Sequence, residues 1–337
     1  MNKVFAAGAA LALLCLGGIA QANVFNLGSG LTNLETVTVG DPGNDPDTRY
    51  GTPGYGSVGY AYNIGKYEVT AAQYADFLNN KAATYGDPYG YGLYNKSMAG
   101  TYGCKIQRSG DGTPADPYVY TVADDWANRP VNYISFWDAC RFANWLHNGQ
   151  GNGDTETGAY TLNGYSSEDD RTIYRNANWK WAVTSEDEWY KAAYYKGGGT
   201  NASYWVFPTQ SNTPPTHKAP TSGANSANYM HVVGQTTNVG AYTGSASAYG
   251  TFDQAGNVWE WNEAIVYDGS DHAYRGQRGG SYYNLGYTLP ASNRYYTAPT
   301  LESSLLGFRV SYVPEPSPII ALAGGLISLL GMRRRRA

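Results

Sequence analysis

The chain has 337 residues, of which 15% are charged and 15% aromatic, and it contains 42 glycines and 32 tyrosines. This composition is typical of a compact, loop-rich protein with an aromatic core and excludes a disordered chain. The net charge of -4 comes with no basic stripe that could neutralise a phosphate backbone, so we expect no nucleic-acid partner. Length alone fits one large domain or two small ones.

The N-terminus has the three parts of a secretory signal peptide. Lys3 supplies the charge, an apolar run follows from Val4 to Ala20, and Ala20-Gln21-Ala22 is a small-x-small cleavage site. We therefore expect a signal peptide over residues 1–22 and export across the inner membrane. In an oxidising compartment the two remaining cysteines, Cys104 and Cys140, could form a disulfide or stay as separate thiols.

A turn-rich stretch follows, and residues 23–54 are expected to form a loop-rich lead into the domain. Three helix starts come after it, each with a hydroxyl at the N-cap and a carboxylate or amide three residues later. These are Thr70-x-x-Gln73, Ser135-x-x-Asp138 and Ser185-x-x-Glu188, each followed by apolar residues at helical spacing. Few helices among short strands and long loops indicate the α+β class.

Six segments resemble, in order, the conserved blocks of the formylglycine-generating (sulfatase-modifying factor) family. The most specific are Gly-Asn-Val-Trp-Glu-Trp (256–261), Arg-Gly-Gly-Ser (278–281) and Gly-Phe-Arg-Val (307–310). The other three lie at 64–74, 129–135 and 185–193. The resemblance implies a single α+β domain over residues 55–312 with a C-type-lectin-like core. Independently of it, Arg309 beside Phe308 is expected to be a buried arginine that is hydrogen-bonded or ion-paired and not catalytic.

Two carboxylates and two carbonyls around a glycine turn suit calcium, a hard cation that prefers oxygen ligands. The resemblance implies such a site at Asp253, Gly256, Val258 and Glu260, with the glycine and valine contributing carbonyls. A second family calcium site would begin at Asn228, but the loop after it carries no carboxylate.

Formylglycine synthesis in that family needs a pair of cysteine thiolates that hold copper(I), which selects sulfur ligands. The pair falls just after the Arg-Gly-Gly-Ser block, where this chain has Asn284 and Leu289. Neither side chain can replace a thiolate. We therefore expect no copper, no catalytic residues of that kind and no formylglycine-generating activity.

Two functional hypotheses remain. The first is an exported binding or structural module for a polysaccharide or protein of the matrix, with a pocket near the position of the family's active site. Its candidate lining residues are Trp259, Tyr282, Tyr283, Asn284 and Arg294. The alternative is a divergent metal-dependent oxidase or hydroxylase that uses the same pocket.

The C-terminal segment, residues 313–337, resembles a PEP-CTERM sorting signal. Pro314-Glu315-Pro316 precedes an apolar run over residues 317–332 and an arginine cluster over residues 333–336. About fifteen apolar residues are short for a membrane span of ~30 Å, which favours transient anchoring. The resemblance implies cleavage by an exosortase-type sorting protease and delivery to the cell surface or extracellular matrix. The alternative is an ordinary tail anchor.

Overall fold

The computed structural model describes residues 34–84, 92–169, 171–269 and 272–314. The signal peptide expected over residues 1–22 lies outside these ranges, as does the sorting tail from Glu315 onward. The described chain has helices α1 Ala71–Lys81, α2 Asp124–Ala127, α3 Phe136–His147 and α4 Glu186–Tyr194, with 3-10 helices η1 Thr48–Tyr50, η2 Lys96–Ala99 and η3 Gly286–Thr288. Together with the strands this confirms the α+β class.

Two four-stranded sheets and two short two-stranded pairs, one antiparallel and one parallel, make up the strands of the described residues. The first sheet has the order β1-β2-β12-β5, with β1 Thr36–Val39, β2 Tyr62–Gly65, β5 Trp181–Val183 and β12 Val310–Tyr312. The second has the order β10-β9-β8-β11, with β8 Trp259–Tyr267, β9 Ala273–Arg278, β10 Tyr295–Thr297 and β11 Leu306–Phe308. The two-stranded pairs are β3 Gln107–Ser109 with β4 Val119–Thr121, and β6 Thr216–His217 with β7 Ser226–Ala227.

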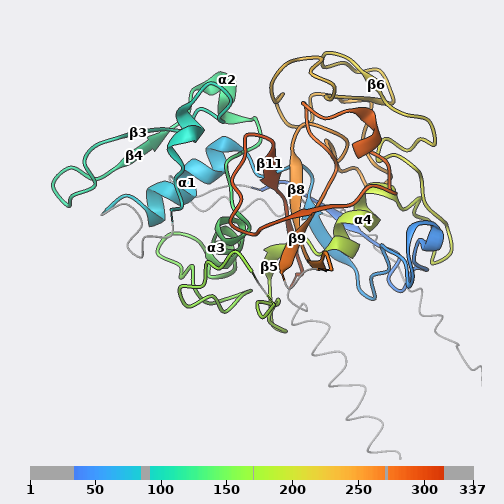
Figure 1. Ribbon diagram of the computed structural model, residues 1–337, viewed down its shortest axis with the longest axis horizontal. Coiled ribbons are helices and arrows are strands. Elements are labelled where there is room, and N and C mark those ends of the chain that lie inside the picture. Colours follow the sequence, from blue (N-terminus) through green and yellow to red (C-terminus); the bar gives the residue numbers. More distant parts are fainter. Residues whose placement is uncertain (1–33, 85–91, 170, 270–271, 315–337) are drawn as a thin grey trace, which may run out of the picture.

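One residue separates the two sheets along the chain. β11 pairs in parallel with β8, whereas β12 pairs antiparallel with both β2 and β5, and only Arg309 lies between β11 and β12. The side chain of this residue therefore starts at the junction of the two sheets. Figure 1 shows β11 and β8 next to each other near the middle of the molecule, with α3 and α4 on either side.

The three helix starts expected from the sequence are confirmed. Each has a capping box in which the N-cap hydroxyl accepts from the backbone N–H of the residue three positions later, whose side chain accepts in return. Thr70, Ser135 and Ser185 are the three N-caps. Helix α2 was not expected, because its N-cap Ala123 offers no side-chain acceptor and only four residues are helical.

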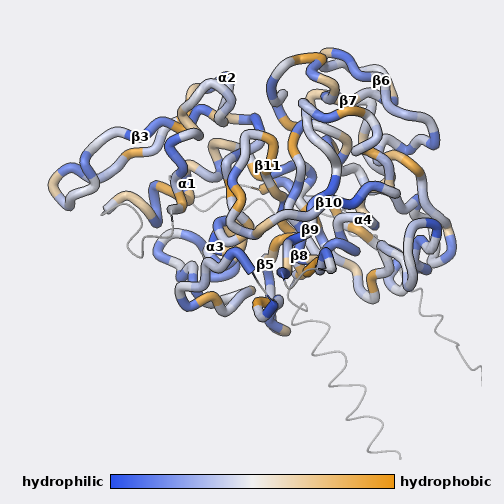
Figure 2. Tube along the Cα trace, in the orientation of Figure 1, coloured by the Kyte–Doolittle hydropathy of each residue, from blue (hydrophilic) through white to orange (hydrophobic). Residues whose placement is uncertain are grey.

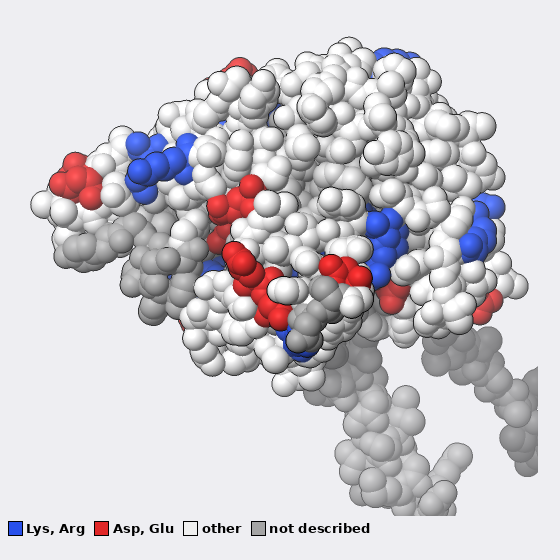
Figure 3. All heavy atoms as spheres, viewed as in Figure 1, with Lys and Arg blue, Asp and Glu red and all other residues white. Residues whose placement is uncertain are grey.

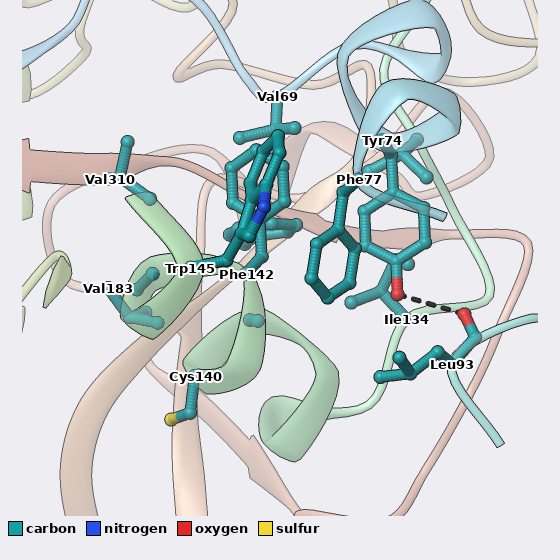
Figure 4. Packing of buried hydrophobic residues seen from close by; sticks show 14 of the residues in the cluster. Val69, Tyr74, Phe77, Leu93, Ile134, Cys140, Phe142, Trp145, Val183 and Val310 are labelled. Carbon is teal, nitrogen blue, oxygen red and sulfur yellow. Dashed lines mark hydrogen bonds between the residues drawn. The ribbon is translucent and has the colours of Figure 1, made fainter. Parts of the chain in front are cut away.

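The largest hydrophobic cluster packs α1 and α3 against the strands through aromatic rings (Figure 4). Phe77 lies 5.3 Å from Tyr74, 5.5 Å from Phe142 and 5.3 Å from Trp145, measured between ring centroids. Tyr74 also donates its hydroxyl hydrogen to the carbonyl of Leu93 at 2.9 Å. Such ring pairs stabilise a core by about 0.5–1.5 kcal/mol beyond the area they bury.

The part of the expected N-terminal lead that the structure describes is built into the domain. β1 pairs antiparallel with β2 over four residues. Asn44 is buried and donates to the carbonyl of Gly56 at 2.8 Å, while Asp47 accepts from the Tyr190 hydroxyl of α4 at 2.6 Å. The domain thus includes residues from Thr36 onward and not only from residue 55, because β1 completes the edge of the first sheet.

Hydropathy alternates along the described chain without a long continuous apolar segment (Figure 2). Accordingly, none of the helices in the described ranges combines the length and apolar character needed to cross a bilayer.

Candidate ligand-binding cavity

A cavity of about 340 Å³ opens at one end of the second sheet. Each of the four strands of this sheet contributes a lining residue. Residues of η3 and of the segment that precedes β11 complete the wall. The lining residues are Trp259, Gln277, Asn284, Tyr287, Thr288, Asn293, Tyr295, Leu301, Ser303, Leu305 and Leu306. None of these residues carries a carboxylate, an imidazole, an ammonium, a guanidinium or a thiol, so the wall consists of rings, aliphatic groups and neutral polar groups.

Asn284 is held in a defined orientation at the cavity wall. Its Oδ1 accepts from the indole N–H of Trp259 at 2.8 Å and from the Ser281 hydroxyl at 2.6 Å, and its carbonyl accepts from the N–H of Met230 at 2.9 Å. Two donors on one oxygen fix which amide atom is which. Within the described chain the Nδ2 group donates to no protein acceptor, so it is available to a ligand.

Aromatic rings continue from the cavity across the outer strands. The Trp259 ring lies 5.5 Å from Tyr295, which lies 6.3 Å from Tyr296, and that ring lies 5.5 Å from Tyr274. The three interplanar angles are 32°, 25° and 40°, so the rings are inclined to one another by modest angles. Tyr295 is 55% exposed and Tyr287, also at the cavity, is 69% exposed. Amphipathic rings exposed in this way are common contact groups.

Of the five pocket residues expected from the sequence, two line the cavity and three do not. Trp259 and Asn284 line the cavity. Tyr282 is buried, and Tyr283 is exposed with its ring 3.9 Å from that of His231. Arg294 does not line the cavity, because both carboxylate oxygens of Glu186 bind its guanidinium at 2.8 and 2.7 Å.

Most of the lining residues were missed from the sequence. The sequence prediction placed the pocket mainly at the residues directly after the Arg-Gly-Gly-Ser block. In the structure, residues of β9, of β10 and of the segment from Leu301 to Leu306 also line the cavity. The adjacent pair Tyr295-Tyr296 was the one sequence signal that could have indicated an aromatic surface there.

The two positions matched to the copper-binding cysteines differ in their surroundings. Asn284 faces the cavity, whereas Leu289 is fully buried in a separate hydrophobic cluster and its carbonyl accepts from the Tyr194 hydroxyl at 3.0 Å. In the described chain Cys104 and Cys140 are both buried and form no disulfide. Burial raises the pKa of the Cys104 thiol, which disfavours its thiolate.

The carboxylate of Glu260, an expected calcium ligand, is already bound by a cation. Arg309 donates from Nε to Oε2 at 2.5 Å and from Nη2 to Oε1 at 2.6 Å, and the indole N–H of Trp189 also donates to Oε2 at 2.8 Å. Both charged side chains are fully buried. The expectation of a buried Arg309 with polar partners is confirmed, and its partner is Glu260, one of the residues expected to bind calcium.

Other oxygens beside this ion pair remain unsatisfied. Among the described residues, Oε2 of Glu68 and Oδ1 of Asn228 are buried without a hydrogen-bond partner. Asn257 lies between them, donating to Oε1 of Glu68 at 3.1 Å and accepting from Nδ2 of Asn228 at 3.4 Å. Burial raises the pKa of Glu68 well above its ordinary value, and the nearby charge of Asp253 raises it further. Burial also raises the pKa of Asp253, to about 6.

Unsatisfied buried oxygens of this kind are what a hard cation would bind. However, the described ranges contain no group of three or more His, Cys, Asp or Glu side chains that could hold a metal ion.

The sequence profile described as "Sulfatase-modifying factor enzyme 1-like domain" matches residues 37–312. No curated protein matches the chain. Among solved structures, variable protein 1 of Treponema denticola has 20% identity, with 84% of this chain and 96% of that chain covered and a TM-score of 0.49. The crystal structure of CarF has 21% identity, coverage of 84% and 99%, and a TM-score of 0.49. PvdO from Pseudomonas aeruginosa has 17% identity, coverage of 87% and 98%, and a TM-score of 0.47.

Proposed function

Because the chain belongs to the sulfatase-modifying factor family, with the matching profile spanning residues 37–312, we propose that it is a non-catalytic member that binds a ligand in the cavity beside Trp259 and Asn284. The observation that carries the proposal is the neutral, ring-lined cavity wall. A thiolate pair for copper(I) has no counterpart among the lining residues, since Asn284 offers an amide and Leu289 is packed in the core.

A neutral polysaccharide of the surface or matrix is the ligand class that this wall favours. Sugar rings present apolar C–H faces and hydroxyl edges, which match aromatic rings and fixed amide groups respectively. Tyr295 and Tyr287 supply exposed rings, and Asn284 supplies an oriented amide donor. The absence of charged lining residues disfavours a strongly charged ligand, because a buried ion would lack a partner.

The same proposal includes export and surface display. Its support is the sequence, which carries a signal-peptide pattern over residues 1–22 and a PEP-CTERM-like tail over residues 313–337. An exosortase-type protease would then cleave the tail after transient anchoring in the membrane, leaving the domain at the cell surface or in the extracellular matrix. The proposal also includes a structural calcium ion at the loop of Asp253, Gly256, Val258 and Glu260. Its support is that Glu68 and Asn228, beside this loop, have buried oxygens without a hydrogen-bond partner.

The experiment is a glycan array probed with the purified protein, followed by titration of each bound glycan against two single variants. Tyr295→Ala removes an exposed ring at the cavity, and Tyr102→Ala removes a ring of similar exposure, 62% against 55%, that does not line it. We expect Tyr295→Ala to weaken binding about ten-fold and Tyr102→Ala to leave it unchanged.

Equal effects of the two substitutions would remove the cavity from the proposal. The non-catalytic assignment would be overturned if the purified protein converted a cysteine of a sulfatase peptide to the aldehyde. It would also be overturned if the purified protein contained stoichiometric copper.

A further inference from the structure

Two side-chain amides in the wall of the ligand cavity have buried atoms that no group of the described chain binds. Gln277, on β9, is 3% exposed, and its Nε2 is buried without a hydrogen-bond partner. Oδ1 of Asn293, just before β10, is also buried without a partner. Both residues line the cavity together with Asn284. Because a buried polar group without a partner destabilises the folded protein, these two amides require an explanation.

The main chain holds both residues at the cavity. β9 lies between β8 and β10, and Gln277 is paired with Tyr295 of β10. The N–H of Asn293 donates to the carbonyl of Pro290 at 2.8 Å, and its own carbonyl accepts from Nη1 of Arg278 at 2.7 Å. The backbone of both residues is thus fixed by the sheet, so only side-chain rotation changes what the two amides present to the cavity.

Each of the two amides can present either a donor or an acceptor. A primary amide has an N–H₂ group and a carbonyl oxygen at the same end, and a half-turn exchanges their positions. No side-chain hydrogen bond within the described chain holds Gln277 or Asn293 in one of these orientations. Asn284 differs, because its oxygen accepts from Trp259 and Ser281 and its Nδ2 remains as a donor. The wall therefore offers one fixed donor and two adjustable amides.

Aliphatic side chains share the wall with these amides. Leu301, Leu305 and Leu306 line the cavity from the segment that leads into β11. No lining residue carries a charged group, so a charged part of a ligand would lose its hydration without gaining a partner. A ligand group that matches this wall is therefore uncharged, forms hydrogen bonds with amides and also contacts aliphatic carbon.

A secondary acetamide group meets all of these requirements. Its carbonyl oxygen has two lone pairs, which can accept from Asn284 and from one adjustable amide, while its N–H can donate to the other. Its methyl group can contact the leucines. A hydroxyl group also donates and accepts, but it has a single oxygen for three amides and no methyl group. An ammonium group would enter a wall that has no carboxylate to pair with it.

We propose that Gln277, Asn284 and Asn293 form a subsite for the acetamido group of an N-acetylated sugar. The assignment rests on the proposed binding function and names the part of the polysaccharide that the cavity recognises. The exposed rings of Tyr287 and Tyr295 at the same cavity would contact the sugar ring that carries the group. Gln277 and Asn293 would determine specificity, because a sugar without the acetamido group leaves their amides unpaired.

The test compares two oligosaccharides of the same length and linkage, one of N-acetylglucosamine and one of glucose, by titration calorimetry. We expect the wild type to bind the N-acetylated oligomer about ten-fold more tightly or better. Gln277→Met keeps a side chain of similar length but removes the amide, so it should reduce the difference to less than about two-fold. Gln107→Met, at an exposed amide on β3 that does not line the cavity, should keep the wild-type preference.

The melting temperature of Gln277→Met separates specificity from a structural role. Because the amide nitrogen has no partner in the described chain, its removal should leave the melting temperature unchanged or raise it. A structural hydrogen bond would instead make the variant less stable than the wild type.

Saturation-transfer NMR of the wild type with methyl N-acetylglucosaminide tests the subsite without any variant. We expect the protons of the acetamido methyl group to receive the strongest transfer, because the leucines would surround them. N-acetylalanine methylamide, which carries the same amide chemistry on a peptide, should receive much less, since it has no sugar ring to contact the tyrosines.

Equal binding of the two oligomers by the wild type would overturn the subsite and leave a polysaccharide-binding cavity standing. A Gln277→Met variant that keeps the preference, or that melts at a lower temperature, would also overturn it, as would strong transfer to the peptide probe with none to the sugar. A blank glycan array with clear transfer to the acetamido methyl group would support the subsite and refute binding of a longer polysaccharide. A blank array without any transfer would refute both proposals.

Discussion

Replacing Arg309 by methionine tests how the two sheets are held together. The guanidinium donates twice to Glu260 of β8, and its Nη1 donates to the carbonyl of Gly65 at the end of β2 at 3.0 Å. Its Nη2 reaches the carbonyl of Phe252 at 3.0 Å. Methionine has similar length and fills much of the same space, so the variant removes the charge and the donors without leaving a large cavity.

The cost follows from what remains after the substitution. Glu260 would stay fully buried with Trp189 as its one side-chain donor, and a buried carboxylate that loses its cation costs about 3–5 kcal/mol. Domains are stable by about 5–15 kcal/mol, so this loss is a large fraction of the total. For a protein of this size it corresponds to a decrease in melting temperature of roughly 10 °C.

Urea unfolding of the wild type, Arg309→Met, Glu260→Gln and the double variant gives the measurement. We expect the double variant to be more stable than Arg309→Met alone, because it no longer buries an unpaired charge. A loss below about 1 kcal/mol in Arg309→Met, or a double variant no more stable than the single one, would show that another cation neutralises Glu260 and would refute the reasoning.

Two further predictions concern the same region. Chelation of calcium should lower the melting temperature of the wild type, and Asp253→Asn should remove this response. If calcium was present at a hundred times its dissociation constant, the loss of stability is ~3 kcal/mol. An unchanged melting curve of the wild type would exclude structural calcium. Gly256→Ala should destabilise by about 2–3 kcal/mol, because the added Cβ would lie 2.2 Å from the carbonyl oxygen of Asn228 at a φ of +91°. Gly269→Ala, at a φ of +87° with no atom within 4 Å, measures the backbone strain alone, and equal unfolding free energies for the two variants would contradict the steric explanation.

The helices were predictable because their determinants are local. A capping box spans four residues, so Thr70 with Gln73 and Ser185 with Glu188 can be recognised without knowing what they pack against. α2 shows the limit of the method, since Ala123 at its N-cap provides no signal.

The cavity and its neighbours could not be predicted in the same way. Trp259 and Tyr295 come together only because β8 and β10 flank β9, a pairing that the sequence does not state. Glu260 was expected to bind calcium, and nothing local indicated that Arg309, brought in by the parallel pairing of β11 with β8, would occupy both its oxygens.

The distribution of charge supports the binding hypothesis independently of the missing thiolates. Buried arginines of the described chain neutralise buried carboxylates, as Arg141 does for Glu156 and Arg175 does for Glu188. The face seen in Figure 3 is mostly uncharged, with its lysines, arginines and acidic residues in a few separate groups. These buried ion pairs join loops, helices and strands in the interior. The cavity wall, by contrast, carries none, so selection among ligands there must come from ring contact and neutral hydrogen bonds.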